Sequence, residues 1–291
     1  MSSAIVSRLG TSAATIQRTE RISFQSAPFV VSMTAAAMSA VAAGLTLFVP
    51  NVLRGPAVMN GSGRGTAVVA LAVAVPVLVV SMVAVARGAM RPVITALGAT
   101  AYLIYNAVLF LFVTPVNELF LAYVAMFALC FWTAVTVLKT INVPSFARHF
   151  SVAFPHHALA ATLAAIAVLN ALAWLVRIVP ALLRSHPGSL VEGTGVATNA
   201  IYVQDLSFWI PLMLVAAWWT WRGRAWGLVL TGALFVFGFI ESVSISVDQW
   251  MGGTADPASN IASTSLTVPF AIVALVMCVP AYFYFRSLNR A

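Results

Sequence analysis

Apolar residues along the chain fall into eight long runs, and short polar segments separate one run from the next. Each run holds about 20 residues, which is the length that a helix needs to cross a hydrocarbon core of about 30 Å. The sequence therefore predicts an all-α integral membrane protein, a bundle of about eight transmembrane helices. The predicted spans cover residues 27–49, 66–86, 93–113, 115–138, 157–179, 203–221, 225–248 and 266–286.

The segments outside these runs divide the chain further. Residues 1–26 are rich in Ser, Thr and Arg and are interpreted as a polar cytoplasmic tail, with a short helix on the anionic inner leaflet as the alternative. Residues 27–286 form the polytopic membrane domain, and residues 287–291 form a cytoplasmic C-terminal tail. Thr114 and Pro115 predict the start of the fourth helix, as an N-cap followed by proline at the first helical position. The sequence contains no evident internal repeat, so an inverted-repeat transporter fold has no sequence support.

Composition and charge agree with a membrane protein. The chain is 62% hydrophobic and 8% charged, whereas soluble domains carry about 25% charged residues. The net charge of +8 comes from basic residues spread thinly between the runs, so topology explains it better than nucleic-acid binding. With the N-terminus inside, most of the 15 basic residues fall on the cytoplasmic side, and the C-terminus is then cytoplasmic as well. Abundant alanine and arginine suggest a bacterial source, so we expect a multi-pass protein of the bacterial inner (cell) membrane.

Glu241 interrupts the seventh run, in the stretch FVFGFIESVSISVDQW. Fifteen residues separate it from Trp226, which amounts to roughly 22 Å of helix. A charge deep in a membrane helix costs about 2.5–3.5 kcal/mol on insertion scales, and Ser244 and Asp248 follow Glu241 on one helix face. We therefore expect this face to point into the bundle. The alternative is that the helix ends near Ile240 and that ESVSISVDQW is a surface loop.

Polar side chains in other runs are candidate neighbours of Glu241. Arg177 is expected to form an ion pair with it, or else to anchor its own helix at the interface. Asp205 and Glu118 open their runs, where an acid also complements the helix dipole. Tyr105 and Asn106 belong to the third run, and an asparagine there typically makes an interhelical hydrogen bond. The predicted outward-facing pocket contains Glu241, Arg177, Asp205, Asn106, Tyr105, Glu118 and Asp248.

Sequence motifs of known chemistry are absent. The chain has no CxxC, GxSxG, HExxH or Walker pattern, so no catalytic residue is assigned and the cofactor is unknown. His149, His156 and His157 lack the spacing of zinc sites, and no metal site is assigned. Cys130 and Cys278 lie inside apolar runs and are expected to be small core side chains.

These observations leave three hypotheses. The preferred one is a binding protein or transporter, more a carrier than an enzyme, with an outward-facing polar pocket for a small solute, of which a cation is one candidate. The second is a structural or accessory subunit of a membrane complex. The third is a membrane-embedded enzyme acting on a lipid or isoprenoid, with Glu241 or Asp205 as acid–base groups. The expected partners are membrane lipids, a small solute, and a second copy or a partner membrane subunit, but no nucleic acid.

Overall fold

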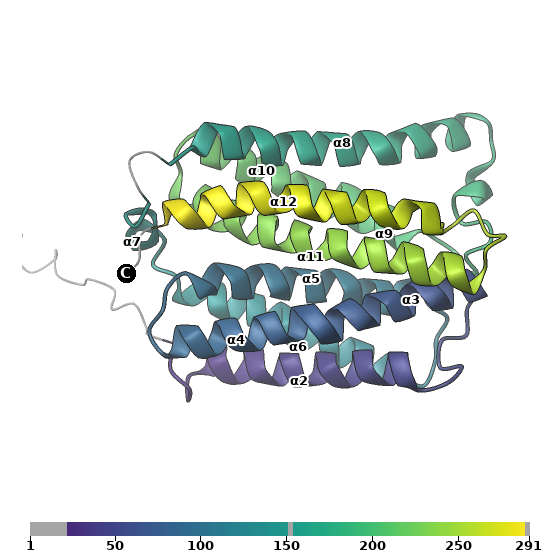
Figure 1. The fold of residues 1–291 in the computed structure, drawn as a ribbon, viewed down its shortest axis with the longest axis horizontal. Helices are drawn as coiled ribbons and strands as arrows, with labels where there is room; N and C mark the ends of the chain where they lie inside the picture. Colours follow the sequence, from purple (N-terminus) through teal and green to yellow (C-terminus); the bar gives the residue numbers. More distant parts are fainter. Residues whose placement is uncertain (1–21, 151–153, 289–291) are drawn as a thin grey trace, which may run out of the picture.

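The computed structural model describes residues 22–150 and 154–288, and these residues form helices and no strand (Figure 1). The predicted N-terminal tail lies outside them up to residue 21, and so do the last three residues of the C-terminal tail. The prediction of eight helices long and apolar enough to cross a membrane is confirmed for the described ranges. Membrane insertion and the cytoplasmic placement of the termini remain predictions. The eight are α2 (Ala27–Phe48), α3 (Ala57–Val69) continued by η1 (Ala70–Ala74) and α4 (Val75–Ala86), α5 (Pro92–Phe112), α6 (Phe120–Thr140), α8 (His156–Leu183), α9 (Ala200–Gln204) continued by η3 (Asp205–Trp209) and α10 (Ile210–Trp221), α11 (Ala225–Ala255), and α12 (Thr267–Ser287).

Several of the predicted helix limits are wrong. Pro115 does not open the fourth helix, because α6 begins five residues later at Phe120. The Thr114 hydroxyl donates to the carbonyl of Phe110 instead of capping a new helix. The seventh helix continues past Glu241 to Ala255, so the surface-loop alternative for ESVSISVDQW is also wrong.

The second helix begins earlier than predicted because its glycines pack against another helix. A Cβ on Gly61 would lie 2.5 Å from the carbonyl oxygen of Met251, and one on Gly65 would lie 2.7 Å from a carboxylate oxygen of Asp248. Glycine weakens an isolated helix, but small residues let two helices approach closely. The packing of α3 against α11 therefore stabilises the glycine-containing start of α3 as a helix, although these glycines disfavour a helix in isolation.

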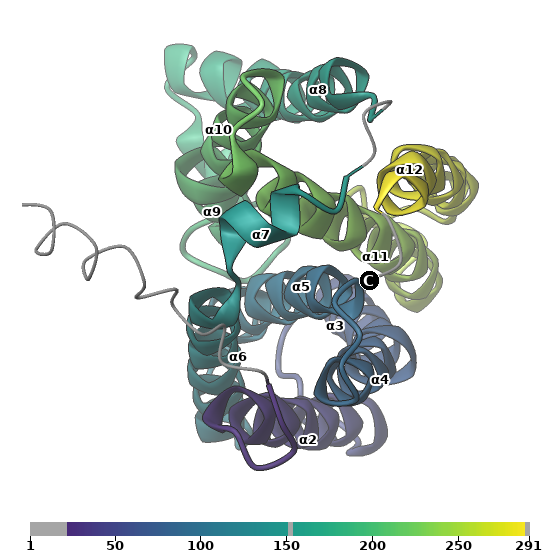
Figure 2. The same cartoon turned by 90° about the vertical axis from the view of Figure 1, so that its left-hand side faces the viewer.

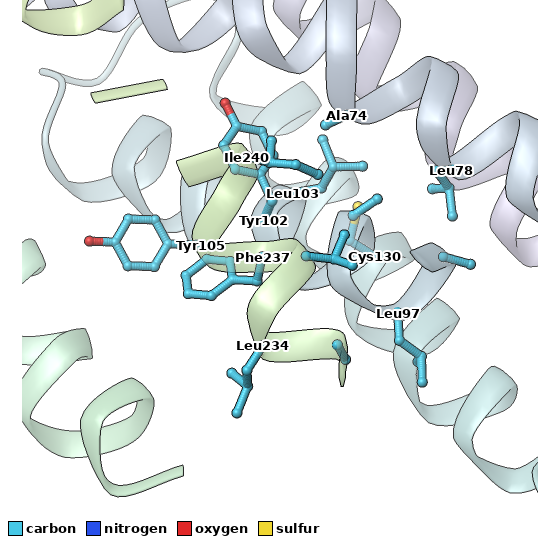
Figure 3. Packing of buried hydrophobic residues seen from close by; sticks show 14 of the residues in the cluster. Ala74, Leu78, Leu97, Tyr102, Leu103, Tyr105, Cys130, Leu234, Phe237 and Ile240 are labelled. Carbon is cyan, nitrogen blue, oxygen red and sulfur yellow. The ribbon is translucent and has the colours of Figure 1, made fainter. Parts of the chain in front are cut away.

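The helices form two groups of four, which we call the first half (α2 to α6) and the second half (α8 to α12). Figure 2 shows the two groups one above the other, with α5 and α11 between them. The central helix is α11, which packs against α3 and α5 of the first half and against α10 and α12 of its own half. Buried Leu103 and Tyr105 from α5 lie beside Phe237 and Ile240 from α11 in the core between the halves (Figure 3).

The two halves share their local architecture. Adding 135 to the residue numbers of η1 and α4 gives the numbers of η3 and α10, so each second helix has a five-residue π-helical segment at the same place. In both, proline follows as the second residue of the next segment, Pro76 in α4 and Pro211 in α10. Both helices then end in Arg-Gly with the glycine in a left-handed conformation, φ 101° at Gly88 and 66° at Gly223. The structure therefore contains a repeat that is not evident in the sequence.

Equivalent residues of the two halves meet between α5 and α11. Asn106 and Glu241, which are 135 positions apart, are joined by a hydrogen bond of 3.1 Å. Gly98 and Ala233 are separated by the same offset, and a Cβ on Gly98 would lie 2.7 Å from the Ala233 carbonyl oxygen. Two related units bring equivalent residues together where the axis that relates them passes. An approximate two-fold axis therefore runs between α5 and α11, along their length.

Candidate functional site

The polar face of α11 is directed at the first half, as its residue spacing predicts. Glu241, Ser244 and Asp248 recur at three and four residues, so they share one face of the helix. Seven residues separate the two acids, which is about 10.5 Å along the axis. Glu241 is half-buried, and its Oε2 accepts a hydrogen bond from Nδ2 of Asn106 on α5.

Asp248 faces α3 where the glycines bring the two helices together. Its Oδ2 accepts a hydrogen bond of 3.1 Å from the Thr66 hydroxyl, and its backbone carbonyl accepts one of 3.2 Å from Ser62. Its other carboxylate oxygen, Oδ1, is buried without a hydrogen-bond partner. This carboxylate therefore retains an unused acceptor inside the bundle.

Tyr102 connects three helices beside these acids. Its side chain is fully buried, and its hydroxyl donates to Ser244 Oγ on α11 at 3.0 Å. The carbonyl oxygen of Thr66 on α3 lies 3.4 Å from the same hydroxyl. Tyr102 thus fixes α3, α5 and α11 relative to one another around the acidic face.

Asp205 supplies a third carboxylate, from the π-helical segment η3. It is buried, and Oδ2 accepts a hydrogen bond of 2.8 Å from the Trp174 indole of α8. The side chains of Tyr105 and Asn170 also interact with this carboxylate. Its position inside a continuous helix differs from the predicted one at the start of a helix, because α9 begins five residues earlier at Ala200.

Aromatic rings fill the space next to Asp205, between α5, η3 and α11. The ring centroids of Tyr105 and Trp209 are 5.8 Å apart, and those of Trp209 and Phe237 are 4.6 Å apart and stacked. Figure 3 shows the rings of Tyr105 and Phe237 next to each other. Aromatic faces attract cations. The rings next to the Asp205 carboxylate therefore add π surfaces that suit a cation to an acidic group.

Among the residues that the structure describes, none of these three acids has a basic partner. Within the described residues a single ion pair is formed, between Arg54 and Glu118, and both side chains are more than half exposed. Lys, Arg and His nitrogens are therefore farther than 4 Å from the carboxylates of Asp205, Glu241 and Asp248 in this part of the chain. A buried charge without a counter-ion is costly, so these carboxylates call for a proton or a cation.

Two predicted site residues lie on the surface instead. Arg177 is exposed on α8, so the expected ion pair with Glu241 is wrong. Glu118 belongs to the loop before α6 rather than to the first turn of that helix. The pKa of the Glu118 carboxyl lies below its ordinary value, because its own backbone N–H donates to it and the Arg54 guanidinium adjoins it. The structure brings together the other five, which are Glu241, Asn106, Asp205, Tyr105 and Asp248.

The sequence analysis missed the contribution of α3. Ser62, which donates to the backbone carbonyl of Asp248, lies before the predicted second span of residues 66–86, and Thr66, which donates to the Asp248 carboxylate, is the first residue of that span. The stretch GSGRG at residues 61–65 has the spacing G-x-x-x-G, which is typical of closely packed membrane helices. That spacing could have indicated the α3–α11 contact.

A polar cavity of about 450 Å³ opens at the end of the bundle where α11 terminates, which the charge pattern predicts to be the outer end. Glu192 and Asp256 line it together with Val58 of α3. A second cavity of about 190 Å³ lies at the opposite end, where Val143 and Pro144 of the short helix α7 (Val143–Ala147) meet Trp219 and Trp226. The three acids of the bundle do not line either cavity.

The histidines and cysteines considered in the sequence lie outside the acidic face of α11. The rings of His156 and His157 are 4.0 Å apart, and His157 lies against Trp221. No group of three or more His, Cys, Asp or Glu residues arranged to hold a metal ion occurs among the described residues. Cys130 is buried against Ser39, as expected, but Cys278 is exposed on α12, so its assignment to the core is wrong.

Comparisons with known proteins give no family for this chain. No family model, no curated protein and no solved structure matches it.

Proposed function

We propose that this protein is a multi-pass carrier or binding protein for a small cationic solute. In this proposal it resides in a bacterial cell membrane with both termini in the cytoplasm. The solute would bind between the two halves, beside Glu241, Asp205 and Asp248. The observation that carries the proposal is that these three carboxylates, of which Asp205 is buried and the other two are partly buried, have no basic partner among the described residues.

The energetics of a membrane interior support this assignment. An ionised side chain there is expensive and typically faces a partner, a cavity or a transported species. The side chains around the acids contribute hydroxyl and amide groups and aromatic faces, and no positive charge within 4 Å in the described ranges. A positively charged solute would supply the missing counter-charge, and Tyr105 and Trp209 would offer it π surfaces.

The position of the acids between two related halves also supports a carrier. Transporters built from parallel repeats bind their solutes at the interface of the repeats and change access by moving one repeat against the other. Here Glu241 lies on the approximate two-fold axis, opposite its equivalent Asn106. Glu192 and Asp256 at the polar cavity would raise the local concentration of cations at the predicted outer end.

The test is a thermal-unfolding screen of the purified protein against inorganic cations, small amines and quaternary ammonium ions. A ligand at 100 times its Kd raises the apparent stability by about 2.7 kcal/mol. We expect at least one cation to stabilise the protein and neutral analogues of the same size to have no effect.

A matched pair of variants assigns any such effect to the site. Glu241→Gln and Glu118→Gln replace the same carboxyl group by an amide, the first within the bundle and the second in an exposed ion pair. The stabilisation should disappear in Glu241→Gln and persist in Glu118→Gln. Equal stabilisation in both variants would contradict binding at the proposed site.

One observation favours the accessory-subunit hypothesis as a second candidate. α8 and α12 touch each other at few residues (Figure 2), and large apolar side chains are exposed on both, such as Leu169 and Leu172 on α8 and Leu275 and Val279 on α12. In this second candidate, a helix of a partner subunit packs against these side chains. Cys278 on α12 allows a direct test by thiol cross-linking in native membranes, with Cys278→Ser as control. A cross-linked product of defined mass would support this candidate, and the absence of any cross-linked product would remove its support.

A further inference from the structure

The side-chain amide of Asn106 makes hydrogen bonds through its nitrogen but not through its oxygen. Its Nδ2 donates to the carbonyl oxygen of Tyr102 and to Glu241 Oε2, each at 3.1 Å. These two acceptors fix which end of the amide carries the nitrogen. The side chain is fully buried, yet its Oδ1 has no hydrogen-bond partner. A strong acceptor is thus left without a donor next to a carboxyl group.

A proton on Glu241 would satisfy both groups. An ionised carboxylate can only accept hydrogen bonds, whereas a carboxylic acid also has an O–H to donate. A carboxylic acid and a primary amide are complementary, because each offers one donor and one acceptor. The acid would accept from Nδ2 and donate to Oδ1 of Asn106. The same proton would remove a partly buried negative charge that has no basic partner within the described ranges.

The ionisable side chains around Glu241 include two further acids and two tyrosines. They are Asp205 from η3, Asp248 from α11, and Tyr102 and Tyr105 from α5. Arg64 on α3 makes no ion pair with any of these acids within the described ranges. The side chains of Arg177 on α8 and Cys278 on α12 are exposed.

We propose that Glu241 is a proton-binding site at the contact between the two halves, with Asn106 as its positioning residue. Binding forms the O–H bond of the carboxylic acid, and release returns the proton to water and leaves a carboxylate. If the proposed function holds, a cationic solute takes the place of this proton as the neutralising charge. Solute binding would then release the proton, which makes the protein a proton–cation exchanger.

Infrared spectroscopy of the purified full-length protein tests the proton site without any solute. We expect the C=O stretching band of a protonated carboxylic acid at neutral pH, which shifts in D₂O and is missing from Glu241→Gln. Glu118→Gln should retain the band. A wild-type spectrum that equals the Glu241→Gln spectrum in this region at neutral pH would overturn the proposal.

Two further variants give the result a second readout. If Glu241→Gln does not fold, Glu241→Asp should keep a band at a changed frequency. In Asn106→Leu the band should move to higher frequency, because the acid loses its amide partner, and Asn106→Gln should move it back towards the wild-type position. An unchanged band in Asn106→Leu would show that Asn106 does not position the proton.

Tetramethylammonium serves as the probe for exchange. In weakly buffered solution a pH-sensitive dye should report about one proton released per cation bound, and none from Glu241→Gln. Binding without proton release would overturn the exchange and leave the proposed function standing. A carboxylic-acid band with no binding of this or any other cation in the screen would support the proton site and overturn the proposed function.

Discussion

The first half of the protein closes on itself, whereas the second half holds two of its helices apart. In the first half α2 packs along α6, and Tyr123 of α6 shares a hydrogen bond of 2.8 Å with Thr46 of α2. The corresponding helices of the second half, α8 and α12, touch at few residues (Figure 2). Two units with the same local architecture therefore have different packing at their outer edges.

The acids follow the same division. Asp205, Glu241 and Asp248 all belong to the second half, and the residues 135 positions earlier are Ala70, Asn106 and Val113. The first half thus presents apolar or neutral side chains where the second half presents carboxylates. The shared scaffold therefore sets the helix positions, while a few residue differences in one half create the polar site.

The largest effect is expected from a methyl group placed between the halves. A Cβ in Gly98→Ala would lie 2.4 Å from Cβ of Val236. Overpacking of this kind costs about 1–3 kcal/mol, so the melting temperature in detergent should fall clearly. Gly44→Ala on α2 is the matched control, because its Cβ would meet nothing within 4 Å. It should be neutral or stabilising by up to about 1 kcal/mol. Equal melting temperatures for the two variants would refute the close α5–α11 contact.

An exchange of equivalent residues tests the two-fold relation. Asn106→Glu alone places two carboxyl groups against each other and should lower the stability by about 1–3 kcal/mol. Adding Glu241→Asn restores one acid and one amide with their helices exchanged, and should recover most of the loss. The measurement is a double-mutant cycle by thermal unfolding. Simple addition of the two single effects would show that the positions are not equivalent.

The hydroxyl of Tyr123 should contribute more than that of an exposed tyrosine in the second half. Tyr123→Phe removes the bond to Thr46 between two buried side chains, which should cost about 0.5–1.5 kcal/mol. Tyr282→Phe is the control, because Tyr282 is exposed on α12 and only accepts from Arg286 at 3.3 Å. Thermal unfolding should separate the two. A larger loss in the control would contradict the view that the first half is the tightly closed one.

The smallest effect is expected from the exposed ion pair. Its lowered pKa means that Glu118 is held in the ionised form, so any stabilisation is present above the ordinary carboxyl pKa and disappears as the pH falls through the lowered one. Exposed pairs contribute little and are screened by salt. Glu118→Gln should therefore leave the melting temperature nearly unchanged at pH 7. A clear loss that high salt does not reduce would show that this loop is more important than its exposure indicates.

Hydrophobic length allowed the eight helices to be predicted from the sequence, because a run of about 20 apolar residues has few other structures available. The starts of α3 and α6 could not be predicted in the same way. The glycines at the start of α3 are helical because they pack against α11, a contact that the local sequence does not reveal. The local sequence around Pro115 is compatible with a helix start and with a turn, and the structure has a turn there.

The polar face of α11 could be predicted from residue spacing, but its partners could not. The partner of Glu241 proved to be Asn106 rather than Arg177, because α8 turns the arginine to the exterior. The relation between the halves is not evident in the sequence, because equivalent segments of the two halves share few identical residues. Among these are Pro76 with Pro211 and Gly88 with Gly223. Apolar side chains in a membrane can be exchanged for one another without changing the fold, so little sequence similarity remains.

The π-helical segments η1 and η3 bear on how the two second helices accommodate their prolines. A π turn holds one residue more than an α-helical turn. A proline lacks the backbone N–H and crowds the carbonyl of the preceding turn, so a wider turn before it relieves that clash. Both π-helical segments lie directly before the segments that carry Pro76 and Pro211. The same proline therefore gives both halves a break in the regular hydrogen bonding at the same depth, and in the second half that break places Asp205.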